Sequence, residues 1–300
     1  MTLYNIIYIK RKLNLNNLYI IMNFLIIGDY GTSDIHQKVV AESMINLIKE
    51  HKVKFICGLG DNIYDFGVKS VNDNKFITHF EEPYKDIKLR FYQCLGNHDY
   101  GKILFNHIIP DDFKYQIEYT KLSKKWYLPK RYYHYSKNIN GVKVNFFVLD
   151  TNIDLMNTNQ MDEQLEFFKE KISKAKDDWN ILYGHHTYRS VSGHGNAEPL
   201  LENFLNALFS LNKIQIYMCG HDHTKQHIIK NDKNPLHILV SGTGGKPYDY
   251  VTNLNNMKDC SLNFMSKNLG VGLLKCKKRS INIEFFDEKS VKEYKYSIKK

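Results

Sequence analysis

The chain is 300 residues long and 43% hydrophobic, which is enough for one large globular domain. It carries a formal net charge of +10, but its lysines are spread along the chain, so the composition favours a solvated basic surface over a nucleic-acid site. No run approaches the roughly 18 consecutive apolar residues of a transmembrane helix. We therefore expect neither a nucleic-acid partner nor a membrane partner, and we favour a monomer.

The cysteines do not form the pattern of a secreted protein. Three of the five, Cys57, Cys94 and Cys219, lie in apolar runs, which predicts buried free thiols. The sequence has no CxxC pair and no Asn-x-Ser/Thr acceptor, and both absences favour a cytoplasmic location.

The two ends of the chain are interpreted separately from its body. Residues 1–21 are apolar but interrupted by Lys10-Arg11-Lys12, whereas a secretory signal begins with its charges. We interpret 1–21 as an N-terminal extension that is disordered or upstream of the true start, and 22–300 as one domain. The densest basic runs, at 275–279 and at the end of the chain, are interpreted as solvated turns or tails.

In the first half of the chain, the sequence predicts strands and one helix. Residues 23–28 are an apolar run that ends in glycine, which predicts a buried strand. Ser33 is the expected N-cap of a helix that runs to about residue 51. Strands are expected at 53–58 and 90–95, so the chain begins as a βαβ unit with parallel strands. Residues 110–131 are polar and irregular, and we expect them to form an excursion outside the core.

The second half alternates strands with two helices. An Asn140-Gly141 turn joins expected strands at 132–136 and 142–149. Apolar residues at helical spacing predict helices over 161–176 and 198–211. Further apolar runs predict strands at 179–183, 214–219, 236–240, 270–276 and 281–286. This alternation predicts the α/β class, with more antiparallel pairing late in the chain.

Five short polar loops, each led by a glycine, follow five of these strands. They are Gly28-Asp29-Tyr30-Gly31, Gly60-Asp61-Asn62-Ile63-Tyr64, Gly96-Asn97-His98-Asp99, Gly184-His185-His186 and Gly220-His221-Asp222-His223. In open α/β sheets, ligand sites form at the carboxyl ends of strands, so these loops are expected to converge. Each loop alone could have a purely structural role, because Asp29 and Asp61 suit tight turns and a lone histidine is usually a surface residue. Five such loops together favour one shared site.

The side chains in these loops suit a pair of metal ions. Two cations about 3.5–4 Å apart can bind both the attacking oxygen and the leaving oxygen of an in-line phosphoryl displacement. A carboxylate must bridge ions that close, and Asp61 at a strand end is suited to this role. Mixed imidazole and oxygen ligands favour iron, zinc or manganese over magnesium or calcium.

The loops resemble the motifs of the calcineurin-like metallophosphoesterases, which read GD, GD, GNH, GHH or GH, and then GHxH. More narrowly, the chain is similar to purple acid phosphatases of the small, tartrate-resistant type. Its first loop reads GDYG, its second reads GDNIYDFGV with a tyrosine three residues after the aspartate, and residues 116–126 also match. The resemblance covers roughly residues 23–245, and it fades after Gly245, so the basic tail is left unassigned.

This resemblance implies a four-layer sandwich of two central mixed β-sheets flanked by helices. It also implies two metal ions, Fe(III) together with Fe(II), Zn(II) or Mn(II). The ligands of the first ion would be Asp29, Tyr64 and His223, those of the second Asn97, His185 and His221, and Asp61 would bridge the two. Substrate phosphate would contact Asn97, His98 and His194. His186 stands where an aromatic residue is more usual, and its role is left open.

The expected function is a dinuclear-metal acid phosphatase that hydrolyses phosphomonoesters by in-line attack of a metal-bound hydroxide. Protonated His98 or His194 would donate to the leaving-group oxygen. The expected substrates are small phosphorylated molecules or phosphoproteins. The alternatives are a metal-dependent phosphodiesterase, nucleotidase or phosphoprotein phosphatase of the same superfamily, or a non-catalytic binding protein on this fold.

Overall fold

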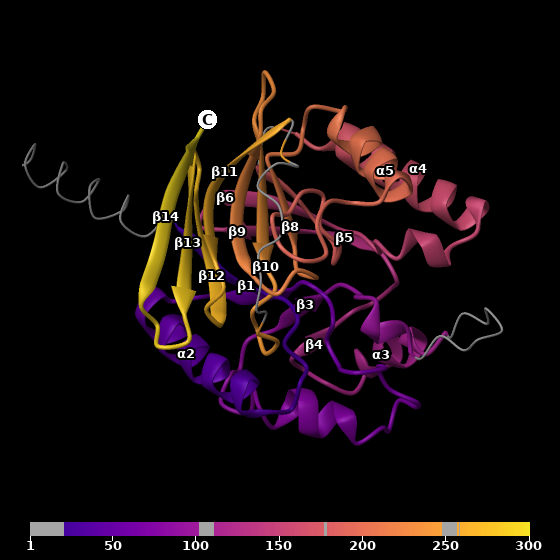
Figure 1. Ribbon diagram of the computed structural model, residues 1–300, viewed down its shortest axis with the longest axis vertical. Helices are drawn as coiled ribbons and strands as arrows, with labels where there is room; N and C mark the ends of the chain where they lie inside the picture. Colours follow the sequence, from indigo (N-terminus) through magenta and orange to yellow (C-terminus); the bar gives the residue numbers. More distant parts are fainter. Residues whose placement is uncertain (1–20, 102–110, 177–178, 248–256, 258) are drawn as a thin grey trace, which may run out of the picture.

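The computed structural model describes residues 21–101, 111–176, 179–247, 257 and 259–300, and of the expected extension only residue 21 lies among them. Two seven-stranded mixed sheets form the centre of the molecule, and helices lie outside them (Figure 1). This arrangement confirms the expected α/β sandwich. In these described ranges, no helix is both long and apolar enough to cross a membrane.

The first sheet is built from the two ends of the chain. Its strand order is β14-β13-β12-β1-β2-β3-β4. The parallel half contains β1 (Met22–Ile27), β2 (Phe55–Gly58), β3 (Phe91–Gln93) and β4 (Trp126–Tyr127). The antiparallel half contains β12 (Gly270–Lys277), β13 (Ser280–Asp287) and β14 (Lys292–Lys299). The parallel half therefore directs three loop-bearing strand ends, those of β1, β2 and β3, to one edge.

The second sheet comes from the middle of the chain, in the order β11-β9-β10-β8-β7-β6-β5. Its parallel centre contains β6 (Val142–Val148), β7 (Trp179–Tyr183), β8 (Ile216–Cys219) and β10 (Leu236–Ser241). Antiparallel strands flank this centre, namely β5 (Tyr133–Ile139), β9 (Lys225–Lys230) and β11 (Cys260–Ser266). The expected turn between β5 and β6 is present, with Asn140 and Gly141 both at positive φ.

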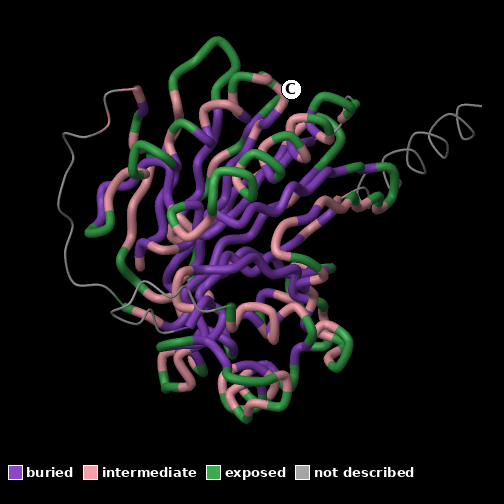
Figure 2. The backbone as a smooth tube through the Cα atoms, turned by 90° about the vertical axis from the view of Figure 1, so that its right-hand side faces the viewer, coloured by how far each residue is buried: buried purple, intermediate pink, exposed green. Residues whose placement is uncertain are grey.

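Aromatic side chains fill the space between the two sheets. Phe24 of β1 stacks on Phe55 of β2 at 5.0 Å and meets Phe146 of β6 edge-on at 5.3 Å. Buried backbone runs through the centre of the molecule in Figure 2, with exposed segments at its periphery. All five cysteines are free and buried, as three of them were expected to be. This packing holds the two sheets together beneath the loops.

Three long helices cover the outer faces. Helix α2 (Ile35–His51) packs against the first sheet, while α4 (Thr158–Lys174) and α5 (Pro199–Phe209) pack against the second. The expected N-cap at Ser33 is wrong, because Asp34 caps α2 by accepting from the backbone N–H of Gln37 at 3.1 Å. Asp34 has the extended backbone typical of an N-cap, with φ at −101°, whereas Ser33 sits at positive φ before the helix.

The segment expected to lie outside the core is in fact part of it. Residues 113–119 form helix α3 (Phe113–Tyr119), and β4 closes the edge of the first sheet. Trp126 is buried, and its indole N–H donates to the carbonyl of Gln116 at 2.9 Å. The basic run at 275–279 is a solvated turn only in part, because Lys278 and Arg279 form an exposed turn whereas Lys275 lies in β12 and pairs with Glu284 at 2.8 Å. The expected tail at the chain end is wrong, because this segment forms β14. Short helical turns complete the elements at Ile77–Glu81, His98–Tyr100 and Ile153–Leu155.

Candidate metal centre

The five glycine-led loops meet at one edge of the molecule, where β1, β2 and β3 of the first sheet face β7 and β8 of the second. Close approach of the loops requires two of the glycines. A Cβ atom at Gly96 would overlap the Asp61 carboxylate, and one at Gly220 would overlap that of Asp29. Asp29, Asp61 and His221 themselves adopt positive φ, an uncommon conformation that Asp and His tolerate better than most residues and that the tight loops require here.

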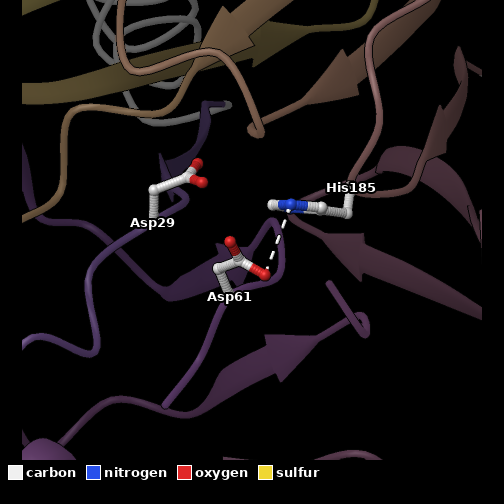
Figure 3. A group of neighbouring side chains, drawn as sticks. All are labelled: Asp29, Asp61 and His185. Carbon is white, nitrogen blue, oxygen red and sulfur yellow. Dashed lines mark ion pairs between the residues drawn. The ribbon is translucent and has the colours of Figure 1, made fainter. Parts of the chain in front are cut away.

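Asp29, Asp61 and His185 form the centre of this cluster, with one ligand atom of each within 4.8 Å of the others (Figure 3). All three side chains are buried, and His185 Nε2 lies 3.4 Å from Asp61 Oδ1. In the part of the chain described, neither of the two buried carboxylates forms an ion pair with a lysine or arginine, so they require another source of positive charge. A metal ion is the usual source.

One oxygen of Asp61 faces a group of nitrogen and amide ligands. His185 Nε2 and His221 Nδ1 each lie 3.1 Å from the Asn97 side-chain oxygen, and 3.2 Å from one another. His185 Nδ1 lies 2.8 Å from the carbonyl of Leu59, which fixes the ring proton on Nδ1. The lone pair of Nε2 therefore points into the cluster, as a metal ligand requires.

The other oxygen of Asp61 faces a group of oxygen ligands. The Tyr64 hydroxyl donates to Asp61 Oδ2 at 2.8 Å and lies 3.1 Å from Asp29 Oδ1. His223 Nε2 lies 3.5 Å from the same Asp29 oxygen. The seven residues expected from the sequence are thus brought together in two groups with Asp61 between them, and this donor set fits two cations.

The charges of the cluster act on one another. Burial opposes ionisation of Asp61, but the neighbouring His185 outweighs it and lowers the pKa of the carboxyl. Burial opposes protonation of His185, yet Asp61 and Asp29 raise its pKa to about 9. Burial and the same two carboxylates raise the pKa of the Tyr64 hydroxyl. Without a bound cation, the His185 imidazole and the Tyr64 hydroxyl therefore hold their protons, and the Asp61 carboxyl is ionised.

Three further histidines border the cluster, namely His98, His194 and His186. His98 Nδ1 lies 2.5 Å from the carbonyl of Asp65, and its ring is 4.5 Å from that of Tyr64. The ring of His194 is 4.1 Å from that of His221. These two histidines, expected to contact phosphate, lie beside different groups of the cluster.

The surroundings of His186 define which of its nitrogens can donate. Thr151 Oγ1 accepts the backbone N–H groups of His185 and His186, at 3.1 and 3.0 Å, and lies 2.8 Å from His186 Nδ1. A hydroxyl that already accepts two hydrogen bonds has only its own hydrogen left to offer. The neutral His186 ring is therefore protonated at Nε2.

Sequence reasoning missed the residues that hold the loops in place. The Asp99 carboxylate accepts from the backbone N–H of Gly96 at 2.8 Å and of Asn62 at 3.0 Å, and from the Gln116 amide at 2.8 Å. Burial raises the pKa of Asp99 to about 6. Asp222 accepts from the backbone N–H of His194 at 2.8 Å. Both aspartates lie within the glycine-led loops, which was the one signal available for them.

Comparisons with known proteins agree with this geometry. The family model for calcineurin-like phosphoesterases matches residues 22–225. The chain is 31% identical to tartrate-resistant acid phosphatase type 5 of Sus scrofa over 250 residues, which are 75% of this chain and 70% of the relative. It is 27% identical to purple acid phosphatase 4 of Arabidopsis thaliana over 287 residues, 89% of this chain and 80% of the relative.

Solved structures share the fold. GAP50, described as the anchor in the inner membrane complex of Plasmodium, superposes with a TM-score of 0.77 at 20% identity, covering 93% of this chain and 89% of that one. Purple acid phosphatase PPD1 from yellow lupin superposes with a TM-score of 0.73 at 16% identity, covering 93% and 54%. The chain therefore belongs to the calcineurin-like phosphoesterase family, is similar within it to the tartrate-resistant purple acid phosphatases, and is a metal-dependent phosphatase.

Proposed function

We propose that this phosphatase hydrolyses phosphomonoesters at a centre of two metal ions. The position of Asp61 carries the proposal, because its two carboxylate oxygens face two separate groups of ligand atoms. We assign Asp29, Tyr64 and His223 to one ion and Asn97, His185 and His221 to the other. Asp61 bridges them.

The proposed ions follow from the chemistry of the two groups. A phenol and carboxylates suit a hard trivalent cation, so we assign Fe(III) beside Tyr64. The two imidazoles and the amide oxygen suit Fe(II), Zn(II) or Mn(II). When bound, such ions supply Lewis acidity towards phosphate oxygens and lower the pKa of water.

The protein's own residues complete the proposed site. His98 orients the phosphate from the side of Tyr64, whereas Asn97 and His194 do so from the side of His221. A protonated imidazole of His98 or His194 donates to the leaving-group oxygen. The backbone hydrogen bond from His194 to Asp222 fixes the loop that carries this side chain.

The proposal is tested on the metal-loaded full chain. We expect iron by elemental analysis, a visible band from charge transfer between Tyr64 and Fe(III), and hydrolysis of 4-ethylphenyl phosphate at mildly acidic pH. Asp61→Asn should lower the metal content and reduce kcat/KM by more than about a hundredfold, because an amide offers one oxygen in place of two and cannot bridge both ions. The exposed Asp162, on the surface of α4, provides the matched control as Asp162→Asn.

Three outcomes separate the parts of this proposal. A colourless but active protein that contains zinc or manganese alone would contradict the ferric assignment and leave the phosphatase reaction standing. Full metal content in Asp61→Asn would contradict the bridging role. A metal-loaded protein that hydrolyses diesters faster than monoesters would contradict the substrate class.

A further inference from the structure

Two cavities open beside the metal centre. The first has a volume of about 320 Å³ and is bordered by His194 and His221. The second has a volume of about 360 Å³ and is bordered by Asn97 and His98. Asp154 and His186 line both cavities, so the two meet in front of the metal centre. A phosphate bound at the centre would place the rest of its ester in one of them.

The first cavity has an apolar wall suited to an organic group. Four of its lining residues are aliphatic, namely Ile153, Ala197, Leu200 and Leu201. Leu200, on the first turn of α5, is 47% exposed, although its neighbour Leu201 is 7% exposed. Covering a solvated leucine beside a polar site with a ligand is favourable, because it removes apolar surface from water. The wall therefore favours a leaving group with a hydrocarbon or aryl body.

The charges around this cavity are negative. Asp154 and Glu198 line it and are both exposed, and among the residues that the structure describes no lysine or arginine lines either cavity. Arg189 lies close in the chain, but its guanidinium is held by Glu202 at 2.5 Å and Asp259 at 3.0 Å. An anionic leaving group would therefore meet two carboxylates without a compensating lysine or arginine among the described residues.

We propose that the first cavity binds the leaving group of the substrate and selects phosphomonoesters with an apolar body that is neutral or cationic. Phosphomonoesters whose leaving group carries a negative charge, such as carboxylated aryl phosphates, are disfavoured by Asp154 and Glu198. This inference rests on the proposed function, because the same metal centre holds the phosphate. It adds the class of leaving group, which neither the family nor the ligand cage specifies.

The test compares three aryl phosphates that differ only in a remote charge. They are the phosphates of tyramine, 4-ethylphenol and 4-hydroxyphenylacetate, which are cationic, neutral and anionic outside the phosphate. A saturated carbon separates each charge from the ring, so the phenol leaving groups are chemically similar. We expect kcat/KM to fall by about fivefold from the cationic to the neutral ester and by a similar factor to the anionic one, the range of exposed charge pairs.

Variants locate the selectivity. Glu198→Gln and Asp154→Asn should each reduce the spread, and the double variant should bring the three esters within about twofold of one another. Leu200→Ser should lower kcat/KM for all three by about threefold, because it removes part of the apolar wall. Asp162→Asn, which removes an exposed carboxylate from α4 without altering either cavity, should leave the spread unchanged.

Equal rates for the three esters in the unmodified enzyme, or a spread that survives in the double variant, would overturn the inference. Failure of the proposed function has a different signature, namely no hydrolysis of 4-ethylphenyl phosphate by metal-loaded protein. In that case calorimetric titration with tyramine, 4-ethylphenol and 4-hydroxyphenylacetate still decides the inference. Binding in that order of affinity, lost in the double variant, supports it, and equal binding or no binding refutes it.

Discussion

Tyr64 is the residue on which the proposed metal assignment depends, and a lysine lies against it. Lys246 Nζ is 4.8 Å from the centre of the Tyr64 ring and 3.9 Å from Asp65 Oδ1. The backbone N–H of Lys246 donates to the carbonyl of Asp29 at 3.2 Å, which fixes the start of its side chain beside the site. A cation over the ring face stabilises negative charge on the phenol oxygen.

This contact predicts a spectroscopic shift. In Lys246→Met, the donor orbitals of the ionised Tyr64 rise in energy, so the charge-transfer band of the ferric protein should move to longer wavelength. The metal content should stay unchanged, because Lys246 supplies no ligand atom. The visible spectrum and elemental analysis measure both, with the exposed Lys38→Met as control. A band at the same wavelength in both variants would show that the lysine has no electrostatic effect on Tyr64.

At the scale of elements, the start of α4 supports one wall of the leaving-group cavity. Asn157 accepts from the backbone N–H of Gln160 at 3.0 Å, and the Gln160 side chain accepts from the backbone N–H of Asn157 at 3.1 Å. This capping box satisfies the first turn of the helix. The short turn Ile153–Leu155, which carries Asp154, directly precedes it.

Removal of the cap should therefore destabilise the protein. Asn157→Ala should lower the free energy of unfolding by about 1 kcal/mol, as is typical for loss of an N-cap. Chemical denaturation measures this change, and Asn159→Ala on the exposed first turn of the same helix is the control. Equal stability of the two variants would mean that the capping box contributes nothing.

The elements found from sequence and those missed differ in polarity. Apolar runs such as those of β1, β7 and β8 are buried on both faces, so composition alone marks them. The strands β9, β11 and β14 were missed because polar residues interrupt them. In β9, Lys225 is fully buried and satisfied by Glu293 at 2.5 Å, a partner 68 positions away. Such a strand is stable only because a residue far away in the same sequence supplies the opposite charge.

The candidate site divides in the same way. Its seven proposed ligands are visible in the sequence because each follows a strand and a glycine. Asp99 lies in one of the same loops and Gln116 lies outside them, but the function of neither could be predicted, because their hydrogen-bond partners are brought together only by the fold. The cavity wall on α5 could not be predicted either, because a leucine such as Leu200 is assigned to the core until its exposure is known.

At the scale of the whole molecule, a pair of buried histidines lies where β14 meets the second sheet. His227 Nε2 lies 3.0 Å from His237 Nδ1, and His227 Nδ1 lies 2.9 Å from the Tyr294 hydroxyl. The Tyr296 ring also contacts both imidazoles. Burial lowers the pKa of His227 to about 3, with a further contribution from His237, and lowers the pKa of His237 to about 4.

These shifts predict acid sensitivity. Between about pH 6.5 and pH 4 the unfolded chain binds protons at both histidines and the folded chain does not, so stability rises with pH there and is lost as pH falls. We expect the free energy of unfolding to drop by about 4 kcal/mol from pH 7 to pH 5 through this pair, following about 1.4 kcal/mol per group for each pH unit below 6.5.

His237→Gln should remove about half of that pH dependence. Denaturation curves at pH 7 and pH 5, recorded at the same metal saturation, measure it, because the difference between the two proteins cancels the contribution of the metals. His36→Gln, at a side chain 42% exposed, is the control. An unchanged pH dependence in His237→Gln would show that the pair does not titrate on unfolding.

The proposed ligands also have an uneven origin in the two sheets. Asp29 and Tyr64 follow strands of the first sheet, whereas His223 follows β8 of the second. The other group combines Asn97, after β3, with His185 and His221 from the second sheet. Each ion would thus act as a further cross-link between two layers that aromatic packing and polar pairs such as Lys225 with Glu293 already join. Metal supply during synthesis would then favour maturation of the whole chain, because an ion that binds only the assembled layers draws the folding equilibrium towards them.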